Sequence, residues 1–497
     1  MKKILVALLL LCMLTSLFSA CAEKKPTDET AAPGASDDAT SAPAETEAYP
    51  NVPEDVKYDG YSFRTLSCLC DVIKFVDFKN DNTDYDVVNE AIFRRNSEIE
   101  QLLDIVIEAH EESGSVFSTG IGFSIMRQDF TAGESRYDLC GLSTWHAAAS
   151  AYNGYLTDLK TVPYLDLNQS WWDQRANIDL AIQGKMYYTN GDIGITDNLA
   201  THCILFSKTI ANEKKITDLY DLVLDGKWTW DKFEGYIRSV SENLDGNDVM
   251  DENDRYGLLC WNDAFQASFG GTRSKIGSVN QETGALELTL YNDKTSTLAE
   301  RITGIFFDNQ YALQCYSNQY SAKVNNAGGM ISLFAKGQGL FVTTMFRILP
   351  DLRNEDMDFG ILPYPKYDET QEEYGGYVGA TYSNMYAIEH FNGDLERTGV
   401  ITEMLAYLAS RYVTPAYYEQ TLKGREVRDE RDIPCLEIIF ANRSFDPGIL
   451  YEVGGYTGKL TDMMKAMTNR FEQITKSFET AAQRKIDNLN EKFAEAS

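Results

Sequence analysis

Apolar and polar residues follow two recurring patterns along most of the chain. A short apolar run of strand length is followed by a longer segment whose apolar residues recur every three or four positions, as in an amphipathic helix. We predict a strand at Tyr61–Leu69 followed by a helix at Asp86–Leu103. A strand at Ile105–Glu108, a helix at about Ile121–Phe130 and a buried strand at Tyr137–Leu142 come next. This rhythm predicts an α/β fold with a mainly parallel sheet.

The same rhythm returns in the second half of the chain. We predict strands at Gly339–Thr344 and Phe359–Leu362, and long helices at about Leu395–Ser410 and Met463–Ala494. The chain has 497 residues, which is enough for two or three domains. No repeat of fixed period is visible, which argues against a solenoid.

The first residues have the composition of an export signal. Two lysines precede the apolar run Ile4–Phe18, which is too short for a comfortable permanent membrane helix. The segment LFSAC at 17–21 resembles a bacterial lipobox, although Phe18 stands where the usual pattern has Leu. We predict a lipoprotein signal peptide at 1–20 and a lipidated Cys21. The alternative is a secreted protein cut near Ala20, with Cys21 a plain thiol.

Residues 21–55 differ in composition from the rest of the chain. They are rich in Ala, Thr, Ser, Pro and acidic residues and have no apolar periodicity. Such a segment cannot bury enough surface to offset its ordering entropy. We predict a disordered tether between Cys21 and the folded body, which places the protein at the cell membrane, lipid-anchored on the extracellular face. No later run is long and apolar enough to cross a bilayer, so the lipid anchor is the only membrane contact we expect.

The charge balance argues against several classes of partner. The chain has 45 Lys and Arg against 75 Asp and Glu, a formal net charge of −30. Binding to nucleic acid or to anionic lipid needs clustered basic residues, so we expect neither. Aromatic residues make up 12% of the chain, which fits a stacking surface for sugars as well as a large aromatic core.

The nine cysteines form no recognisable framework. They stand at positions 12, 21, 68, 70, 140, 203, 260, 315 and 435. An odd number remains after removal of the signal and lipidation of Cys21, and the chain has only four His to complete a zinc site. We expect most of them to be buried small hydrophobic residues.

Five segments together resemble the extracellular solute-binding lipoproteins of carbohydrate-type ABC importers, family 1 in its Gram-positive form. They are AIFRRNSEIEQLLDIVIE at 91–108, SWWDQRANIDLAIQGKMYYTNGD at 170–192, LYDLVLDGKWTWDKF at 219–233, FGILPYPKYDETQEEY at 359–374 and VTPAYYEQTLKGREVRD at 413–429. The resemblance implies a two-lobed α/β fold of the periplasmic-binding-protein type (type II), with hinge strands and a ligand enclosed between the lobes.

The resemblance also implies where the lobes begin and end. The chain should cross between them near Asp192–Phe206, near Tyr377–Tyr386 and near Asn442–Pro447. The N-terminal lobe then comprises 56–200 plus 381–445, and the C-terminal lobe comprises 201–380 plus 446–497.

Residues just after strand ends are the candidates for ligand contacts, because clefts of this architecture open there. Trp145 follows the strand at Tyr137–Leu142 and is the best stacking candidate, although a Trp can also simply cover the end of a sheet. Arg347 follows Gly339–Thr344 and suits sugar hydroxyls or a uronate. One of the adjacent pair Trp171-Trp172 is expected in the core. The predicted contacts are Trp145, His146, Trp172, Trp261, Asn262, Arg347, Tyr382 and Asn384.

An acidic stretch after the helix predicted at Asp231–Glu242 has the spacing of an EF-hand-like calcium loop. Its candidate ligands are Asn243, Asp245, Asn247, Val249 (through its carbonyl), Asp251 and Asp254. Position 6 is Asp248 rather than Gly, and position 12 is Asp254 rather than Glu, so bidentate ligation is less assured. The alternatives are a structural Ca²⁺ and a plain acidic turn; no other cofactor is expected.

No enzyme motif is present. The chain lacks G-x-S-x-G, H-E-x-x-H, a P-loop and G-x-G-x-x-G, and its four His match no triad pattern. We therefore interpret the protein as a monomeric receptor, not an enzyme, that captures a sugar or oligosaccharide and delivers it to the transmembrane subunits of an ABC permease. The alternatives are an anchored glycan hydrolase and a receptor for a peptide, a polyamine or ferric iron, the last held by Tyr187-Tyr188 or Tyr417-Tyr418.

Overall fold

The computed structural model describes residues 49–70, 77–79, 86–317, 327–352, 355, 357–426 and 429–495. The signal peptide, the lipidated Cys21 and most of the predicted tether lie outside the described residues. Tyr49–Ser497 form one compact unit of contacts. Among the helices of the described residues, none combines the length and the apolarity that crossing a bilayer requires.

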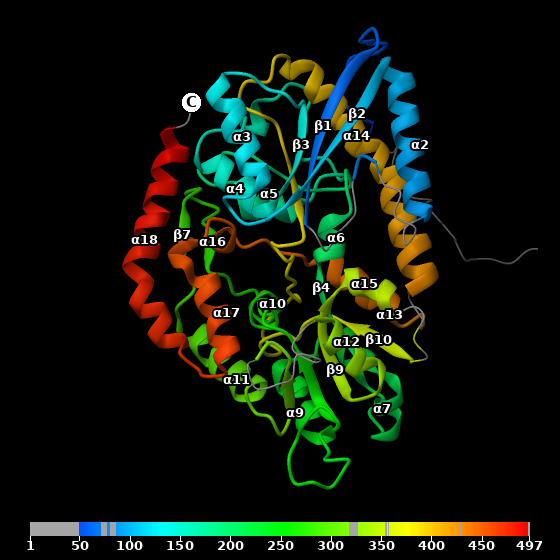
Figure 1. Cartoon of the computed structure of the whole chain (residues 1–497), viewed down its shortest axis with the longest axis vertical. Coiled ribbons are helices and arrows are strands. Elements are labelled where there is room, and N and C mark those ends of the chain that lie inside the picture. The colour runs from blue at the N-terminus through cyan, green and yellow to red at the C-terminus, as the bar shows by residue number, and fades with distance from the viewer. Residues whose placement is uncertain are drawn as a thin grey trace, which may run out of the picture. The chain divides into compact units, whose positions relative to one another are not determined.

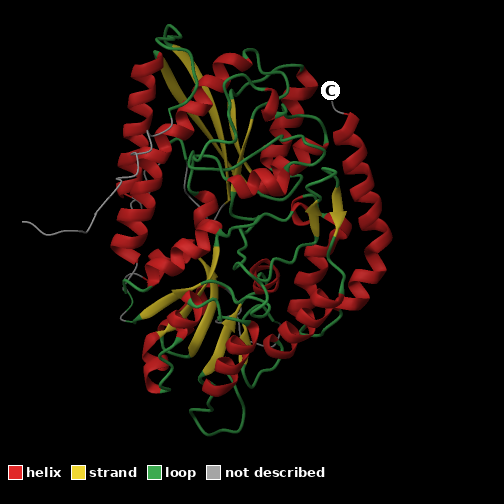
Figure 2. Ribbon diagram, turned by 180° about the vertical axis from the view of Figure 1, so that it is seen from behind, coloured by secondary structure: helices red, strands yellow, loops and turns green. Residues whose placement is uncertain are grey.

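Two sheets organise this unit (Figures 1 and 2). The first has the order β11-β3-β1-β2 and the second has the order β10-β4-β9-β5-β8. The first contains β1 (Tyr61–Cys70), β2 (Ile105–Gly114), β3 (Leu139–Ser143) and β11 (Asn384–Ala387). The second contains β4 (His202–Ser207), β5 (Tyr256–Cys260), β8 (Ala312–Gln314), β9 (Gly339–Met345) and β10 (Phe359–Leu362). A small hairpin of β6 (Gly277–Val279) and β7 (Leu286–Leu288) stands apart from both.

Helices cover both sheets and connect their strands, as the alternating pattern predicts. The longer ones are α2 (Asp86–Leu103), α3 (Ile121–Ala132), α4 (Thr144–Tyr152), α9 (Trp230–Val240), α10 (Ala264–Gly271), α11 (Asp293–Phe306), α12 (Ala327–Ala335), α14 (Leu395–Pro415), α15 (Asp432–Ala441), α17 (Tyr456–Ala466) and α18 (Phe471–Glu495). The shorter ones are α5 (Gln174–Leu180), α6 (Thr196–Ala200), α7 (Lys208–Glu213), α8 (Leu219–Leu224), α13 (Leu349–Leu352) and α16 (Pro447–Leu450).

One large apolar cluster contains residues of both sheets, such as Leu66 of β1 and Ile204 of β4, and each sheet also packs against a cluster of its own. Phe63 and Ile105 of the first sheet are buried together with Leu405 of α14, which packs along α2. Leu205 and Val342 of the second sheet are buried in a separate cluster. Burial of such side chains is the main favourable term in the folding of each half.

The strands and helices predicted from the sequence agree with the structure in most places and differ in two. The first sheet is mainly parallel, as predicted, since β1 pairs parallel with β2 and β3 while β11 pairs antiparallel with β3. The second sheet is mixed, because β4 pairs antiparallel with β9 and β10 while β5 pairs parallel with β8 and β9. The single helix predicted at Met463–Ala494 is wrong. It is two helices, α17 and α18, separated at Met467, whose φ of 49° lies in the left-handed region and ends the first of them.

The chain passes between the sheets at the first two predicted crossings. It leaves α6 and enters β4 at His202, and it returns from β10 to β11 through residues 377–384. The lobe boundaries themselves stay a prediction. One element departs from them, since α15, which lies within the range assigned to the first lobe, packs against β10 of the second sheet.

Candidate functional site

Three strands of the second sheet end at the same edge. β5 runs parallel to both β8 and β9, so their carboxyl ends lie together. Trp261 follows β5, Tyr316 lies two residues after β8, and Arg347 lies two residues after β9. The antiparallel β4 begins at this edge, where His202 pairs with Met345. This is the position at which α/β sheets place their ligands.

Six residues at this edge form three contacting pairs, and we call them the strand-end cluster: Trp261 with Tyr316, His202 with Asp263, and Arg347 with Tyr382 of the second crossing. The Arg347 guanidinium lies over the Tyr382 ring, with the two centres 4.7 Å apart. The Trp261 and Tyr316 rings meet edge to face at 4.9 Å between centroids. Trp261, Asn262, Arg347 and Tyr382 are all half-buried. The edge therefore presents two aromatic faces and a cation without enclosing them completely.

A histidine forms the inner wall of this cluster. His202 is buried, its Nε2 lies 3.8 Å from Asp263 Oδ2, and its ring lies 5.0 Å from that of Tyr377. Burial lowers the pKa of the imidazole; Asp263 partly opposes this, and the charge of Arg347 adds to the lowering. We therefore expect His202 to be neutral at physiological pH.

The second crossing ties the strand-end cluster to the end of β3. Ser383 accepts hydrogen bonds at its carbonyl oxygen from the Thr144 backbone N–H and hydroxyl. Asn190 Nδ2 donates to the backbone oxygen of Asn384, and the Thr196 hydroxyl oxygen accepts from the Asn384 N–H at 3.0 Å. Asn384 thus acts through its backbone here, and the same segment that holds Tyr382 is fixed to the first sheet.

Trp145 lies on the first-sheet side, in the first turn of α4. It is 5% exposed, its Nε1 is buried without a hydrogen-bond partner among the described residues, and its ring lies 6.3 Å from that of Phe117. Phe117 is 58% exposed. The exposed aromatic on this side is therefore Phe117, in the loop after β2, which the sequence analysis did not single out.

Two predicted ligand contacts are buried in the first half of the molecule instead. Trp172 is 2% exposed and its Nε1 donates to Glu403, as does that of Trp171. His146 is 1% exposed, with its Nε2 3.0 Å from the Ser115 carbonyl oxygen. Burial lowers the His146 pKa to about 4. Burial therefore corrects both assignments, because neither Trp172 nor His146 has a side-chain surface exposed to a ligand.

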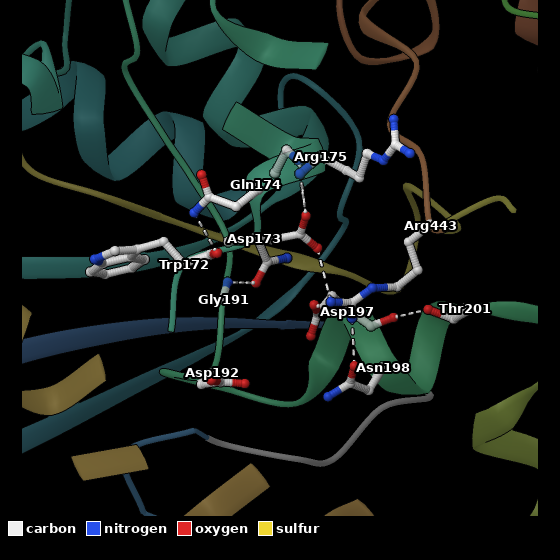
Figure 3. A network of polar contacts seen from close by, with 12 residues as sticks. Trp172, Asp173, Gln174, Arg175, Gly191, Asp192, Asp197, Asn198, Thr201 and Arg443 are labelled. Atoms are coloured by element: carbon white, nitrogen blue, oxygen red, sulfur yellow. Dashed lines mark hydrogen bonds and ion pairs between the residues drawn. The ribbon is translucent and has the colours of Figure 1, made fainter. Parts of the chain in front are cut away.

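An ionic network joins the first crossing to Arg443, which lies in the segment Asn442–Pro447 where a third crossing is predicted (Figure 3). Arg443 lies 2.7 Å from Asp197 of α6 and 2.9 Å from Asp173, which caps α5. Burial raises the pKa of Asp197 to about 7. Asp192 lies close enough for its negative charge to contribute to the raised pKa of Arg443, and it accepts a hydrogen bond from the Thr414 hydroxyl. One arginine thus serves several carboxylates where the chain crosses between the sheets.

The predicted calcium loop closes on itself through its own oxygen atoms. Asp248 adopts a φ of 62°, the conformation that this position of an EF-hand requires. However, Asp254 is fully buried and its two oxygens accept the backbone N–H groups of Leu244 and Asp251. Within the described residues, no group of three or more His, Cys, Asp or Glu is placed to hold a metal ion. Calcium binding by this loop stays a prediction.

The tyrosine pairs considered for iron serve packing here. Tyr188 is buried and donates to the Tyr451 hydroxyl, while Tyr418 packs edge to face on Phe440. Tyr187 and Tyr417 are buried in different apolar clusters. The described cysteines whose side chains are placed are also buried, as the sequence analysis expected.

Comparison with known proteins identifies the fold. No family model matches the sequence, and no curated protein matches it. Solved structures do match. The galacto-N-biose/lacto-N-biose I-binding protein of the ABC transporter from Bifidobacterium longum, in complex with lacto-N-biose, has a TM-score of 0.56 at 11% identity, covering 87% of this chain and 98% of its own.

Two further structures agree with it. A cyclo/maltodextrin-binding protein complexed with maltotetraose has a TM-score of 0.54 at 13% identity and covers 89% of this chain and 100% of its own. A family 1 extracellular solute-binding protein from Bifidobacterium longum subsp. infantis has a TM-score of 0.53 at 14% identity, with coverages of 86% and 100%. The chain has the two-lobed solute-binding fold that the sequence analysis expected.

Proposed function

We propose that this protein is the substrate-binding receptor of an ABC importer and that it captures a sugar or oligosaccharide at the strand-end cluster. The observation that carries the proposal is the position of Trp261, Arg347 and Tyr382 at the shared strand edge of a solute-binding fold. Aromatic faces stack on sugar rings, while half-buried polar groups fix hydroxyl groups. Closure about the crossings would then exclude water from the ligand.

A thermal-shift screen tests this proposal. The purified protein is heated with a panel of mono- and oligosaccharides, and with peptides, polyamines and ferric citrate as non-sugar arms. A ligand at 100 times its dissociation constant adds about 2.7 kcal/mol of apparent stability. A selective shift with one glycan family supports the proposal. A shift with only a peptide, a polyamine or iron would contradict the proposed sugar ligand and identify the protein as a receptor for a non-sugar ligand.

The competing function is that of an anchored glycan hydrolase. No enzyme motif favours it. The strand-end cluster contains one carboxylate, that of Asp263, which lies 3.8 Å from His202. A retaining or inverting glycosidase needs two carboxyl groups flanking the scissile bond. Incubation of the protein with each glycan that shifts its melting temperature, followed by chromatography, separates a receptor from an enzyme.

The location of the protein is a second part of the proposal. We infer that Cys21 carries the lipid anchor and that the ligand passes to the transmembrane subunits of a permease. The lipobox-like LFSAC and the polar segment 21–55 support this arrangement. Incorporation of labelled palmitate into the wild type but not into Cys21→Ser tests the anchor. Incorporation into both would place the lipid elsewhere.

A further inference from the structure

Arg347 differs from the other half-buried arginines because its guanidinium forms no ion pair with a carboxylate of the described residues. Arg443, Arg255 and Arg301 each form ion pairs with carboxylates at 2.6 to 3.0 Å. Arg347 forms none with any described residue, and its buried Nε has no hydrogen-bond partner there. In a chain with a formal net charge of −30, a guanidinium at this strand edge without an ion pair among the described residues is not explained by packing alone.

The guanidinium is nevertheless held in a defined place. It lies two residues beyond β9, in a turn whose Phe346 N–H donates to the Thr201 carbonyl oxygen. The Tyr382 ring covers one face of the guanidinium at 4.7 Å. Cation–π stacking of this kind orients the plane while leaving its N–H edge free. Arg347 is thus positioned to donate, and its buried Nε has no acceptor among the described residues.

We infer that Arg347 receives an oxyanion group of the ligand, so that the receptor selects an anionic glycan bearing a carboxylate, as in a uronic acid. The inference rests on the proposed function and names its substrate class. A planar carboxylate accepts two parallel N–H donors from a guanidinium, which adds geometry as well as charge to the recognition.

Neighbouring charges are consistent with an anion at this edge. Asp263 is the nearest carboxylate of the cluster and faces His202 rather than pairing with Arg347. Lys465 of α17 places its Nζ 5.4 Å from the Tyr316 ring centre, which adds a second cation beside Trp261. His202 itself is buried and therefore neutral. Each of the two cations thus lies over a tyrosine ring of the cluster, Lys465 over Tyr316 and Arg347 over Tyr382.

A neutral sugar would satisfy this arginine less well. Its hydroxyl groups can accept from a guanidinium, but they leave the charge uncompensated. Closure over the ligand would remove Arg347 from water, and burial of an unpaired charge is costly. An anionic ligand group supplies the missing partner at the same moment that closure removes the water.

The test compares two forms of one glycan by calorimetry. A uronate oligosaccharide and its methyl ester have the same rings, but only the first is charged. The wild type should bind the acid about 10- to 100-fold more tightly than the ester. Arg347→Gln should lose most of that difference, and Arg347→Lys should retain part of it. Sulfated and phosphorylated oligosaccharides form separate arms that distinguish the kind of oxyanion.

Arg431→Gln is the matched control. Arg431 also lies 4.7 Å from a tyrosine ring, that of Tyr220, but it is paired with Asp429 at 2.7 Å, away from the strand-end cluster. This variant should bind the acid as the wild type does, and the unfolding curve of each variant confirms that it folds.

Three results would overturn the inference. Equal binding of acid and ester by the wild type would do so and leave the receptor proposal standing. Tight binding of neutral glycans that Arg347→Gln leaves unchanged would have the same meaning. If the protein binds no glycan, acidic or neutral, the inference is overturned together with the proposed function.

Discussion

Arg443 Nη1 lies 2.7 Å from Asp197 Oδ2, which joins the predicted third crossing of the chain to the first. The two residues are 246 positions apart in the sequence. The Arg443 side chain is 15% exposed and that of Asp197 only 2%. A charge pair at this position fixes the segments through which any closing motion must pass.

Removal of the guanidinium should therefore destabilise the fold strongly. Arg443→Met leaves Asp173 and Asp197 buried without a counter-charge, and loss of one partner from a buried pair costs about 3 to 5 kcal/mol. Urea denaturation of the wild type and the variant measures this change. Arg431→Gln, whose pair is largely exposed, should change the free energy of unfolding little. A loss for Arg443→Met no larger than for Arg431→Gln would refute the role given to this network.

Glu403 should make stability depend on pH. Burial raises its pKa to about 7 from the ordinary 4.5, against the opposing hydrogen bonds of the two indole N–H groups. At a pH between 4.5 and about 7, the folded state binds more protons than the unfolded state. The carboxyl group's contribution to stability is therefore complete below about pH 4.5 and is lost as the pH rises through about 7.

Glu403→Gln should remove this component of the pH dependence. The wild type should lose about 3 kcal/mol more than the variant between pH 4.5 and pH 8, measured by urea denaturation at each pH. Below about pH 7 the variant is expected to be less stable than the wild type, because the amide offers one oxygen to the two indole N–H groups whereas the carboxyl group offers two. Parallel pH profiles for the two proteins would show that Glu403 does not titrate in this range.

Two tryptophans should separate binding from stability. Trp261→Phe, at the strand-end cluster, should weaken glycan binding by about 10-fold with little change in melting temperature. Trp172→Phe removes one of the hydrogen bonds to Glu403 and should cost about 1 to 3 kcal/mol of stability while the folded protein binds as before. Calorimetry and urea denaturation on both variants check this. Weaker binding by Trp172→Phe together with lower stability of Trp261→Phe would contradict the two roles.

The acidic loop should respond to calcium if the prediction made for it is correct. Ca²⁺ would have to replace the backbone donors that now occupy the Asp254 oxygens. A titration by calorimetry, followed by the same titration of Asp245→Asn plus Asp251→Asn, measures this directly. We expect binding to the wild type that the double variant weakens at least 10-fold. No heat up to millimolar calcium would identify the stretch as an acidic turn.

Much of the fold could be predicted because its signals are local. The 18 residues of α2 have the same bounds in the sequence pattern and in the structure, since apolar spacing alone defines its buried face. The sheet directions could not be predicted in this way. Whether β4 runs parallel or antiparallel to β9 depends on pairing across the whole chain, which the pattern within each strand does not encode.

The site was predictable only in part, for the same reason. Trp261 and Arg347 could be named as candidates because both follow strands that periodicity reveals, and their contact with a ligand stays a prediction. Trp172 was misassigned because its partner Glu403 is 231 positions away, and the carboxylate that satisfies its indole cannot be identified from the local sequence. The Arg443 network was missed because its charged residues belong to no sequence motif. Arg443, Asp173 and Asp197 come together only when distant segments of the chain pack in the folded structure.

Hydrogen–deuterium exchange with and without a bound glycan tests the central claim most directly. Saturation with a glycan from the thermal-shift screen should slow exchange in the segments that hold Trp261, Arg347 and Tyr382, and in the loop that holds Phe117. The surface of α9 should exchange unchanged. Protection confined to other segments would contradict the placement of the ligand at the strand-end cluster.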